Sequence, residues 1–126
     1  MTMVQARPWD PALGPLQLST LRRLLQQEGM ATAWWSEVPG ARTPEHAHPF
    51  PETHWILSGF LRMRVAGQQV DLGPGDRLDV PAGTKQGAEV LGLAPVVYVT
   101  GAPEAAVSPQ ISQLENSTPS AAWRSA

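Results

Sequence analysis

Glycine and proline residues divide this sequence into short segments, and their spacing constrains the fold more than any other feature. The chain contains 13 prolines and 11 glycines among its 126 residues. They recur at intervals of about 8 to 12 residues, which suits short strands joined by tight turns. From Met30 onward, apolar and polar side chains alternate with a period of two, as they do in half-buried strands. The sequence therefore predicts an all-β domain.

The expected strands lie within residues 30–101, and glycine or proline separates most of them. About eight strands joined by such turns are typical of a jelly roll. A two-residue hairpin turn is expected at Ala66-Gly67. The expected strands are Ala31–Val38, Glu45–His48, Thr53–Ser58, Phe60–Val65, Gln69–Leu72, Arg77–Val80, Gly87–Leu91 and Val96–Thr100.

The two ends of the chain are expected to lie outside this barrel. Residues 1–29 predict an extended arm, because prolines interrupt its beginning, followed by a short amphipathic helix over 19–28 that covers one side of the barrel. Ser19 is the expected N-cap, and Gly29 follows the last turn. Residues 102–126 are rich in alanine, serine and proline and predict a loosely attached tail, with Trp123 as its candidate anchor.

Composition and charge exclude several classes of function. The chain has no cysteine, which excludes disulfides, thiolate metal sites and cysteine nucleophiles and agrees with a cytoplasmic location. Its net charge is −2 and it has a single lysine, so a nucleic-acid partner is not expected. The N-terminus lacks the apolar core of a signal peptide, and no apolar run reaches the length of about 18 residues that a membrane span needs.

All three histidines lie close together in the sequence. His46 and His48, at i and i+2 on an expected strand, leave it on the same face. Pro49-Phe50-Pro51 turns the chain before Glu52, so two imidazoles and one carboxylate are expected to converge. This ligand set is the 2-His-1-carboxylate triad, which suits Fe(II) and also Mn, Ni, Co or Zn. A pair of exposed strand histidines is the alternative interpretation.

The residues around this cluster resemble the cupin family. Its first motif is G-x5-H-x-H-x3-E-x6-G, and the chain matches it in full at Gly40, His46, His48, Glu52 and Gly59. The second motif, G-x5-P-x-G-x2-H-x3-N, is matched at Gly75, Pro81 and Gly83. The resemblance covers about Ala31 to Thr100. It implies a small single-domain cupin of the RmlC-like type, a double-stranded β-helix or jelly-roll barrel that binds a divalent metal at its mouth.

The second motif departs from the family at its metal ligand. The resemblance places the third metal-binding histidine at Gln86 and the motif asparagine at Val90. A glutamine carbonyl is neutral and is a poorer donor than imidazole for these metals. Three interpretations stay open: Gln86 coordinates through its oxygen, water fills its place beside three protein ligands, or the site has become a metal-free pocket.

His54 is the remaining histidine, and the family motif has none at that position. It lies two residues after Glu52, so it is expected to face the barrel interior with Glu52 and Ile56. It is a core histidine bonded to a backbone carbonyl, an acid–base or supporting residue beside the metal ligands, or a substitute for the missing histidine. We take His54 as the candidate catalytic residue.

Strand alternation also predicts which large side chains face outward. Trp34 and Trp35 are neighbours, so one faces in and the other out, and Trp55 faces away from the predicted site. The helix or a partner subunit is expected to cover the outward tryptophans, and the cupin resemblance implies a homodimer. Arg62 and Arg64 share one face, which is solvated if outward and anion-binding if inward. A small hydrophobic pocket is expected, lined by Ile56, Leu61, Met63, Val65, Leu78 and Val80.

These features favour a function at the metal site without defining the reaction, because cupins include oxygenases, isomerases, lyases, decarboxylases and binding proteins. We predict a metal-dependent enzyme that acts on a small oxygenated substrate. Its divalent metal (Fe, Mn, Ni or Zn) would serve as a Lewis acid or as a site for O₂. The alternative is a non-catalytic sensor of a small ligand or of a metal.

Overall fold

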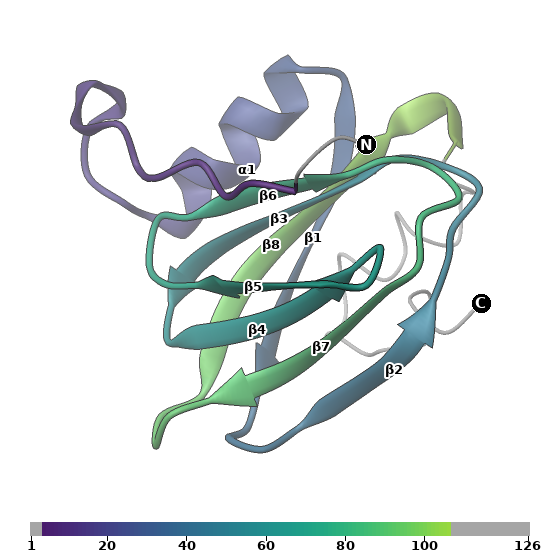
Figure 1. The fold of residues 1–126 in the computed structure, drawn as a ribbon. Helices are drawn as coiled ribbons and strands as arrows, with labels where there is room; N and C mark the ends of the chain where they lie inside the picture. The colour runs from purple at the N-terminus through teal and green to yellow at the C-terminus, as the bar shows by residue number, and fades with distance from the viewer. Residues whose placement is uncertain (1–3, 107–126) are drawn as a thin grey trace.

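The computed structural model describes residues 4–106 and contains two four-stranded antiparallel sheets that face each other (Figure 1). One sheet has the strand order β1-β8-β3-β6 and the other the order β2-β7-β4-β5. Most connections cross from one sheet to the other, as in a jelly roll, which confirms the predicted fold class. The strands are β1 (Met30–Glu37), β2 (Arg42–His46), β3 (Glu52–Ser58), β4 (Phe60–Val65), β5 (Gln68–Leu72), β6 (Arg77–Val80), β7 (Gln86–Leu91) and β8 (Val96–Pro103).

The core lies between the two sheets and consists of the inward-facing side chains of the alternating strands. Trp35 faces into this core, whereas Trp34 packs on the outside of its sheet, as the alternation predicts. The six apolar residues expected to line a small pocket, from Ile56 to Val80, are all buried in this one core cluster. Removal of their surface from water is the main force that keeps the sheets together.

Helix α1 (Leu18–Gln27) covers the outer face of the β1-β8-β3-β6 sheet (Figure 1). Its leucines pack with outward-facing residues of the sheet, which form a second cluster. The fully or largely buried members of this cluster are Leu21, Leu25, Trp55 and Val99. The helix therefore covers the outward-facing Trp55. This confirms the helix as its cover, where the sequence allowed either the helix or a partner subunit. Gly29 follows the helix with a φ of +85°, a left-handed conformation that glycine adopts readily.

Two details of the N-terminal segment differ from the prediction. The helix begins at Leu18, and its N-cap is Gln17, which makes no side-chain capping hydrogen bond, so Ser19 is not the cap. The arm before the helix is also not fully extended, because Pro11–Leu13 form a single 3-10 turn, η1. Asp10 accepts a backbone hydrogen bond within this turn, and proline already has the φ that its first position needs.

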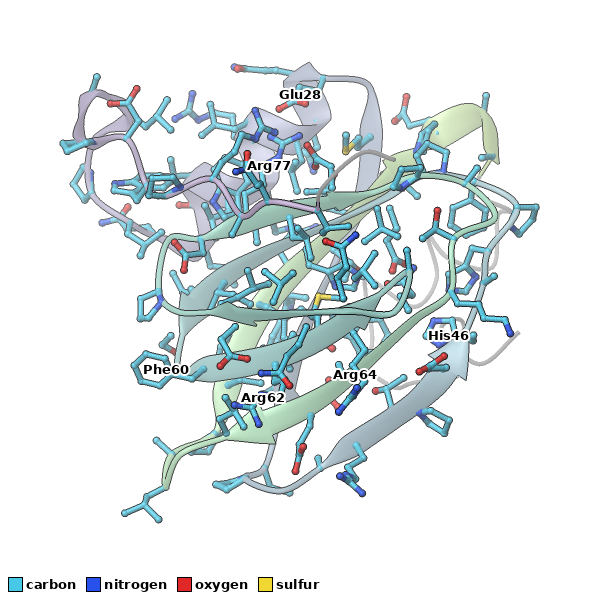
Figure 2. The ribbon with its side chains drawn as sticks, in the orientation of Figure 1. Glu28, His46, Phe60, Arg62, Arg64 and Arg77 are labelled. Carbon is cyan, nitrogen blue, oxygen red and sulfur yellow. The ribbon has the colours of Figure 1, made fainter. Side chains whose placement is uncertain are left out.

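Arg77 on the edge strand β6 connects the arm, the helix and the barrel (Figure 2). Its backbone exchanges hydrogen bonds of 2.8 and 2.9 Å with Arg7. Its guanidinium donates to Glu28 at 2.7 and 2.8 Å and to Asp79 at 3.1 Å, and it lies 5.0 Å from the centre of a Trp55 ring. Hydrogen bonds from Arg77 lower the pKa of Glu28. Burial raises the pKa of Asp79, but hydrogen bonds and the Arg77 charge bring it below its ordinary value.

Replacement of Arg77 by methionine is expected to destabilise the protein by about 2 kcal/mol at pH 7. Because the pKa values of Glu28 and Asp79 are lower in the folded chain than in the unfolded chain, the stability that they contribute is present above their unfolded pKa values. It is lost as the pH falls, between about pH 5 and pH 3. Urea midpoints across this range should therefore fall less steeply in Arg77→Met than in the wild type.

The matched control for this prediction is Arg62→Met, which removes an exposed ion pair with Asp71. It should leave the stability at pH 7 nearly unchanged, because solvent screens an exposed ion pair. The same pH dependence in the wild type and in Arg77→Met would contradict the role given to Arg77.

Several strand bounds differ from the expected ones, most of them by one residue, and β2 begins at Arg42 instead of Glu45. Strand β2 ends at His46, so His48 lies in the following loop and not in a strand. Strand β8 continues to Pro103, past the expected end at Thr100, and a short 3-10 turn, η2, follows at Glu104–Ala106. Trp123, the candidate anchor of the tail, lies outside the described residues. Within residues 4–106, no helix is long and apolar enough to cross a membrane.

Candidate functional site

The two sequence motifs meet at one end of the barrel, where Figure 2 shows His46 at the end of β2. In the register of β2 and β7, His46 faces Gln86, the first residue of β7. The backbone N–H of Gly83 donates a 2.7 Å hydrogen bond to the carbonyl of His48. Gly83 has a φ of +73°, a conformation that favours glycine. This glycine of the second motif therefore joins the turn before β7 to the histidine loop of the first.

His46 and His48 lie side by side as predicted, but strand alternation is not the reason. Their ring centres are 4.8 Å apart, and the ring planes meet at 74°. Because β2 ends at His46, the loop after the strand sets the position of His48. Phe50, further along this loop, stacks on His48 with ring centres 4.9 Å apart. His48 is buried, whereas His46 is partly exposed.

The hydrogen bond of His46 determines which of its nitrogens can bind a metal. Nδ1 lies 2.9 Å from the carbonyl oxygen of Pro44. We assign the proton to Nδ1, because a carbonyl oxygen can only accept. Nε2 then presents a lone pair, and it is buried without a hydrogen-bond partner among the described residues. Metal-binding histidines have this arrangement, with one N–H bonded to a carbonyl and the other nitrogen facing the ion.

Glu52 brings the negative charge of the site and is only 2% exposed at the start of β3. Burial raises the pKa of this carboxyl, but the charge that His54 can carry 2.8 Å away, followed by those of His48 and His46, brings it below its ordinary value. All three imidazoles therefore lie close enough to stabilise the ionised form. Within the described part of the chain, neither carboxylate oxygen has a well-aligned hydrogen bond.

His54 connects Glu52 to Gln86 across the barrel. It is buried and faces inward, as predicted. Its Nε2 lies 2.9 Å from Gln86 Oε1 and 2.8 Å from Glu52 Oε1. Only the contact with Gln86 has the alignment of a hydrogen bond, so the contact with Glu52 is mainly electrostatic. His54 therefore bonds a side-chain amide, and not the backbone carbonyl that one interpretation assumed.

The residues present fit a divalent metal in their chemistry. A buried imidazole lone pair and a buried carboxylate are donors that such ions prefer. Residues 4–106 nevertheless contain no group of three or more histidine, cysteine, aspartate or glutamate side chains already arranged to hold a metal ion. The assignment of His46, His48, Glu52 and Gln86 as ligands therefore stays a prediction.

Strand β8 also contributes to this region, through residues that were not among the predicted site residues. Tyr98 is buried, and its ring centre lies 6.0 Å from that of His54. Its hydroxyl donates a hydrogen bond to Glu37 on β1. Trp35 Nε1 donates to Thr100 Oγ1 at 2.8 Å. The i, i+2 spacing of Tyr98 and Thr100 on an expected strand is the signal that places both on the inner face.

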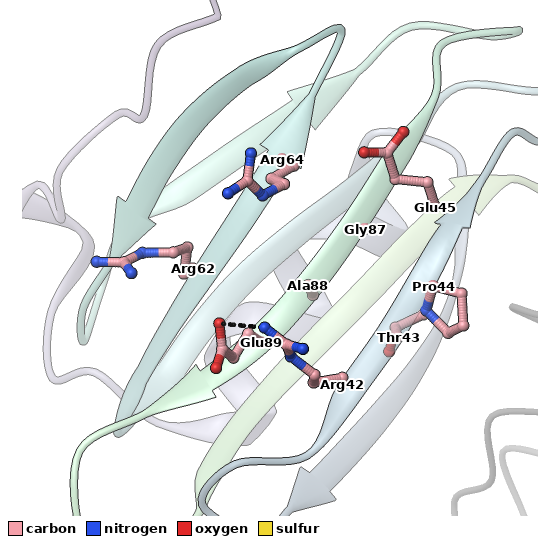
Figure 3. A pocket seen from close by; sticks show the side chains of 9 residues that line it. All are labelled: Arg42, Thr43, Pro44, Glu45, Arg62, Arg64, Gly87, Ala88 and Glu89. Atoms are coloured by element: carbon pink, nitrogen blue, oxygen red, sulfur yellow. Dashed lines mark ion pairs between the residues drawn. The ribbon is translucent and has the colours of Figure 1, made fainter.

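A second candidate is a groove of about 330 Å³ on the outer face of the β2-β7-β4-β5 sheet (Figure 3). Arg62 and Arg64 point outward here, which is the solvated one of the two alternatives, and not into the barrel. Arg62 pairs with Asp71 at 2.9 Å, and Arg42 pairs with Glu89 at 3.5 Å. Ion pairs therefore already neutralise most of the positive charge of the groove. The groove is thus a weaker candidate for a functional site than the histidine cluster.

Comparisons with known proteins agree with this architecture. The family model of the cupin domain matches residues 33–100. No curated protein sequence matches the chain. An uncharacterized conserved protein with a double-stranded β-helix domain from Klebsiella pneumoniae is 27% identical, with a TM-score of 0.56 over 63% of this chain and 71% of that one.

Two further solved structures are similar over a smaller share of their own length. A mutant of the oxalate decarboxylase OxdC from Bacillus subtilis is 26% identical, with a TM-score of 0.57 over 64% of this chain and 23% of that one. The cupin domain of Schizosaccharomyces pombe Cnp3 is 20% identical, with a TM-score of 0.56 over 61% of this chain and 58% of that one. The last similarity shows the fold alone.

Proposed function

This chain belongs to the cupin domain family, and on that basis we propose that it is a metal-dependent enzyme acting on a small oxygenated substrate. The observation that carries the proposal is the buried polar group of the first motif. His46 presents a buried Nε2 lone pair, and Glu52 is a buried carboxylate with a lowered pKa. A divalent cation would supply the partner that these donor atoms lack, because polar groups away from water need one.

The donor set supports a first-row divalent metal held by His46, His48 and Glu52. Two neutral imidazoles and one carboxylate suit Fe, Mn, Ni or Zn. When bound, the ion would supply Lewis-acid or O₂ chemistry at an open position. The carbonyl of Pro44 keeps His46 in the tautomer that a ligand needs. Glu52 has a pKa below its ordinary value, so it can meet the cation as an ionised carboxylate.

The substrate class follows from the polarity of this end of the barrel. His54 and Gln86 are buried polar side chains beside the predicted ligands and would orient an oxygenated compound. The name of the Bacillus subtilis neighbour makes oxalate the first compound to assay, as a test compound only, because the match spans 23% of that chain. A sensor would bind metal or ligand without turnover, so product formation by the metal-loaded protein distinguishes the two functions.

We also propose a cellular location and an oligomeric state. The absence of cysteine supports a cytoplasmic location. The family resemblance supports a homodimer. The outward-facing Trp55 adds no further support, because α1 already covers it.

Metal analysis of untagged protein tests the proposed function. After reconstitution with Fe, Mn, Ni or Zn, the wild type is expected to hold about one ion per chain and His46→Ala less than about 0.1, because two protein donors bind such ions poorly. Arg64→Ala, in the outer groove, is the control and should keep the full content. A wild type without any of the four metals would refute the metal enzyme. Full content in His46→Ala would refute the ligand assignment.

A further inference from the structure

Gln86 stands where the family motif has its third metal-binding histidine, but its side-chain oxygen already has a partner. Oε1 accepts a 2.9 Å hydrogen bond from His54 Nε2, and both side chains are buried. The loss of a hydrogen bond in such a place costs about 1–3 kcal/mol. Coordination of a metal by the glutamine carbonyl, which is a weak ligand for these ions, would have to offset the loss of this hydrogen bond. Coordination through Gln86 is therefore disfavoured.

The ring nitrogens of His54 are arranged in the opposite way to those of His46. Nε2 of His54 faces two oxygens, so we assign its proton to Nε2, where it can be donated. If Nε2 bound a metal, the proton would move to Nδ1. That nitrogen is buried, and no described residue accepts a hydrogen bond from it. His54 therefore lacks the acceptor that a metal-binding histidine uses, whereas His46 has the carbonyl of Pro44.

We propose that His54 is a positioning residue, and that neither His54 nor Gln86 is a metal ligand. The proposal rests on the proposed function, since it assumes a metal held by the residues of the first motif. The Nε2–H of His54 holds the oxygen of Gln86 and stands 2.8 Å from Glu52 Oε1. His54 thus packs against the carboxylate and limits where it can turn, and Gln86 fixes the ring of His54.

The proposal has a consequence for the substrate. The ligand position that the family motif fills with histidine is left to an oxygen atom from outside the chain, which is supplied by water or by the substrate. The enzyme would therefore bind its substrate by exchange of an oxygen ligand on a metal with three protein ligands. A small compound with a carboxylate, hydroxyl or carbonyl oxygen has this chemistry.

The tautomer of His54 can be tested without metal. In the metal-free protein, long-range ¹H–¹⁵N spectra of the imidazoles are expected to show His54 as the Nε2–H form and His46 as the Nδ1–H form. Gln86→Ala should shift the His54 ring signals, because it removes the acceptor, and should leave the tautomer of His46 unchanged. A His54 ring with its proton on Nδ1 would overturn the proposal, whether or not the protein binds metal.

Binding of Co²⁺ tests the ligand count, because its visible absorption depends on the ligands. His54→Ala is expected to weaken Co²⁺ binding by about 10–100-fold, as for other residues that orient a ligand. His54→Gln, which keeps an N–H donor, should recover most of this loss. Gln86→Ala should weaken binding less than about tenfold, and the absorption spectrum should stay the same in all three variants. His46→Ala is the control for loss of a true ligand.

Each outcome of the Co²⁺ experiment supports or contradicts one of the two proposals. An altered spectrum in His54→Gln, or a loss as complete as in His46→Ala, would show that His54 is a ligand. An altered spectrum in Gln86→Ala would show the same for Gln86. If the wild type does not bind Co²⁺ or the other metals, the proposed function fails, and the nitrogen spectra still decide the role of His54.

Discussion

Replacement of Gly59 by alanine is expected to destabilise the barrel by at least about 3 kcal/mol. Gly59 lies between β3 and β4, where the chain passes from one sheet to the other. Its φ is +78°, a conformation that is strained for any side chain with a Cβ. A Cβ at this position would also lie 2.5 Å from the carbonyl oxygen of Pro95 and 2.7 Å from Cα of Val96. Backbone atoms at the start of β8 would have to move to make room.

Gly67→Ala is the matched control for this prediction. Gly67 has the same φ of +78°, but no atom of the described residues, apart from its two chain neighbours, lies within 4 Å of the position that a Cβ would take there. The backbone strain alone should cost about 1 kcal/mol. Urea unfolding of the two variants at pH 7 then separates the strain from the steric clash. Equal losses of stability in both variants would contradict the close approach at Pro95.

Gly59 illustrates what a sequence motif can and cannot predict. The first cupin motif indicates that position 59 is glycine in a turn, and the structure agrees. The contact that excludes a Cβ comes from Pro95, which lies far along the chain and outside both motifs. Contacts of this kind depend on how distant strands approach each other, so local spacing does not contain them.

Most of the strands could be predicted because alternation is a local property that burial on one face imposes. It placed Trp34 and Trp35 on opposite faces of the sheet and Arg62 and Arg64 on one shared face. The errors occurred where local preference was not decisive. Ser19 is a good capping residue by type, but the helix begins one residue before it.

The candidate site also has some features that the sequence predicts and others that only the structure shows. The rings of His46 and His48 are adjacent as the spacing predicts, but the loop after β2 brings them together and not the strand alternation on which the prediction rested. The hydrogen bond between His54 and Gln86 joins strands of different sheets, so no short-range pattern could reveal it. Gln86 was recognised as a departure from the motif, but its partner could be identified only from the structure.

Glu52→Gln is expected to remove most of the stability that the protein gains from metal. A ligand at about 1,000 times its Kd raises the free energy of unfolding by about 4 kcal/mol. The substitution keeps the size and shape of the buried side chain but replaces a negative ligand with a neutral amide, a weak donor for these ions. If affinity falls about 100-fold, the same metal concentration stabilises the variant by only about 1.4 kcal/mol.

The measurement is urea unfolding with and without Zn²⁺ or Mn²⁺, and Glu89→Gln is the control. Glu89 lies on the outer face of the barrel, where it pairs with Arg42, so its loss should leave the gain from metal at about 4 kcal/mol. The quantity compared is the increase in the free energy of unfolding that metal causes in each protein, so any effect of either substitution on the metal-free protein cancels. If Glu52→Gln gains as much from metal as the wild type, the ion binds elsewhere. A gain lost in Glu52→Gln alone would connect the buried charge of the first motif directly to metal binding.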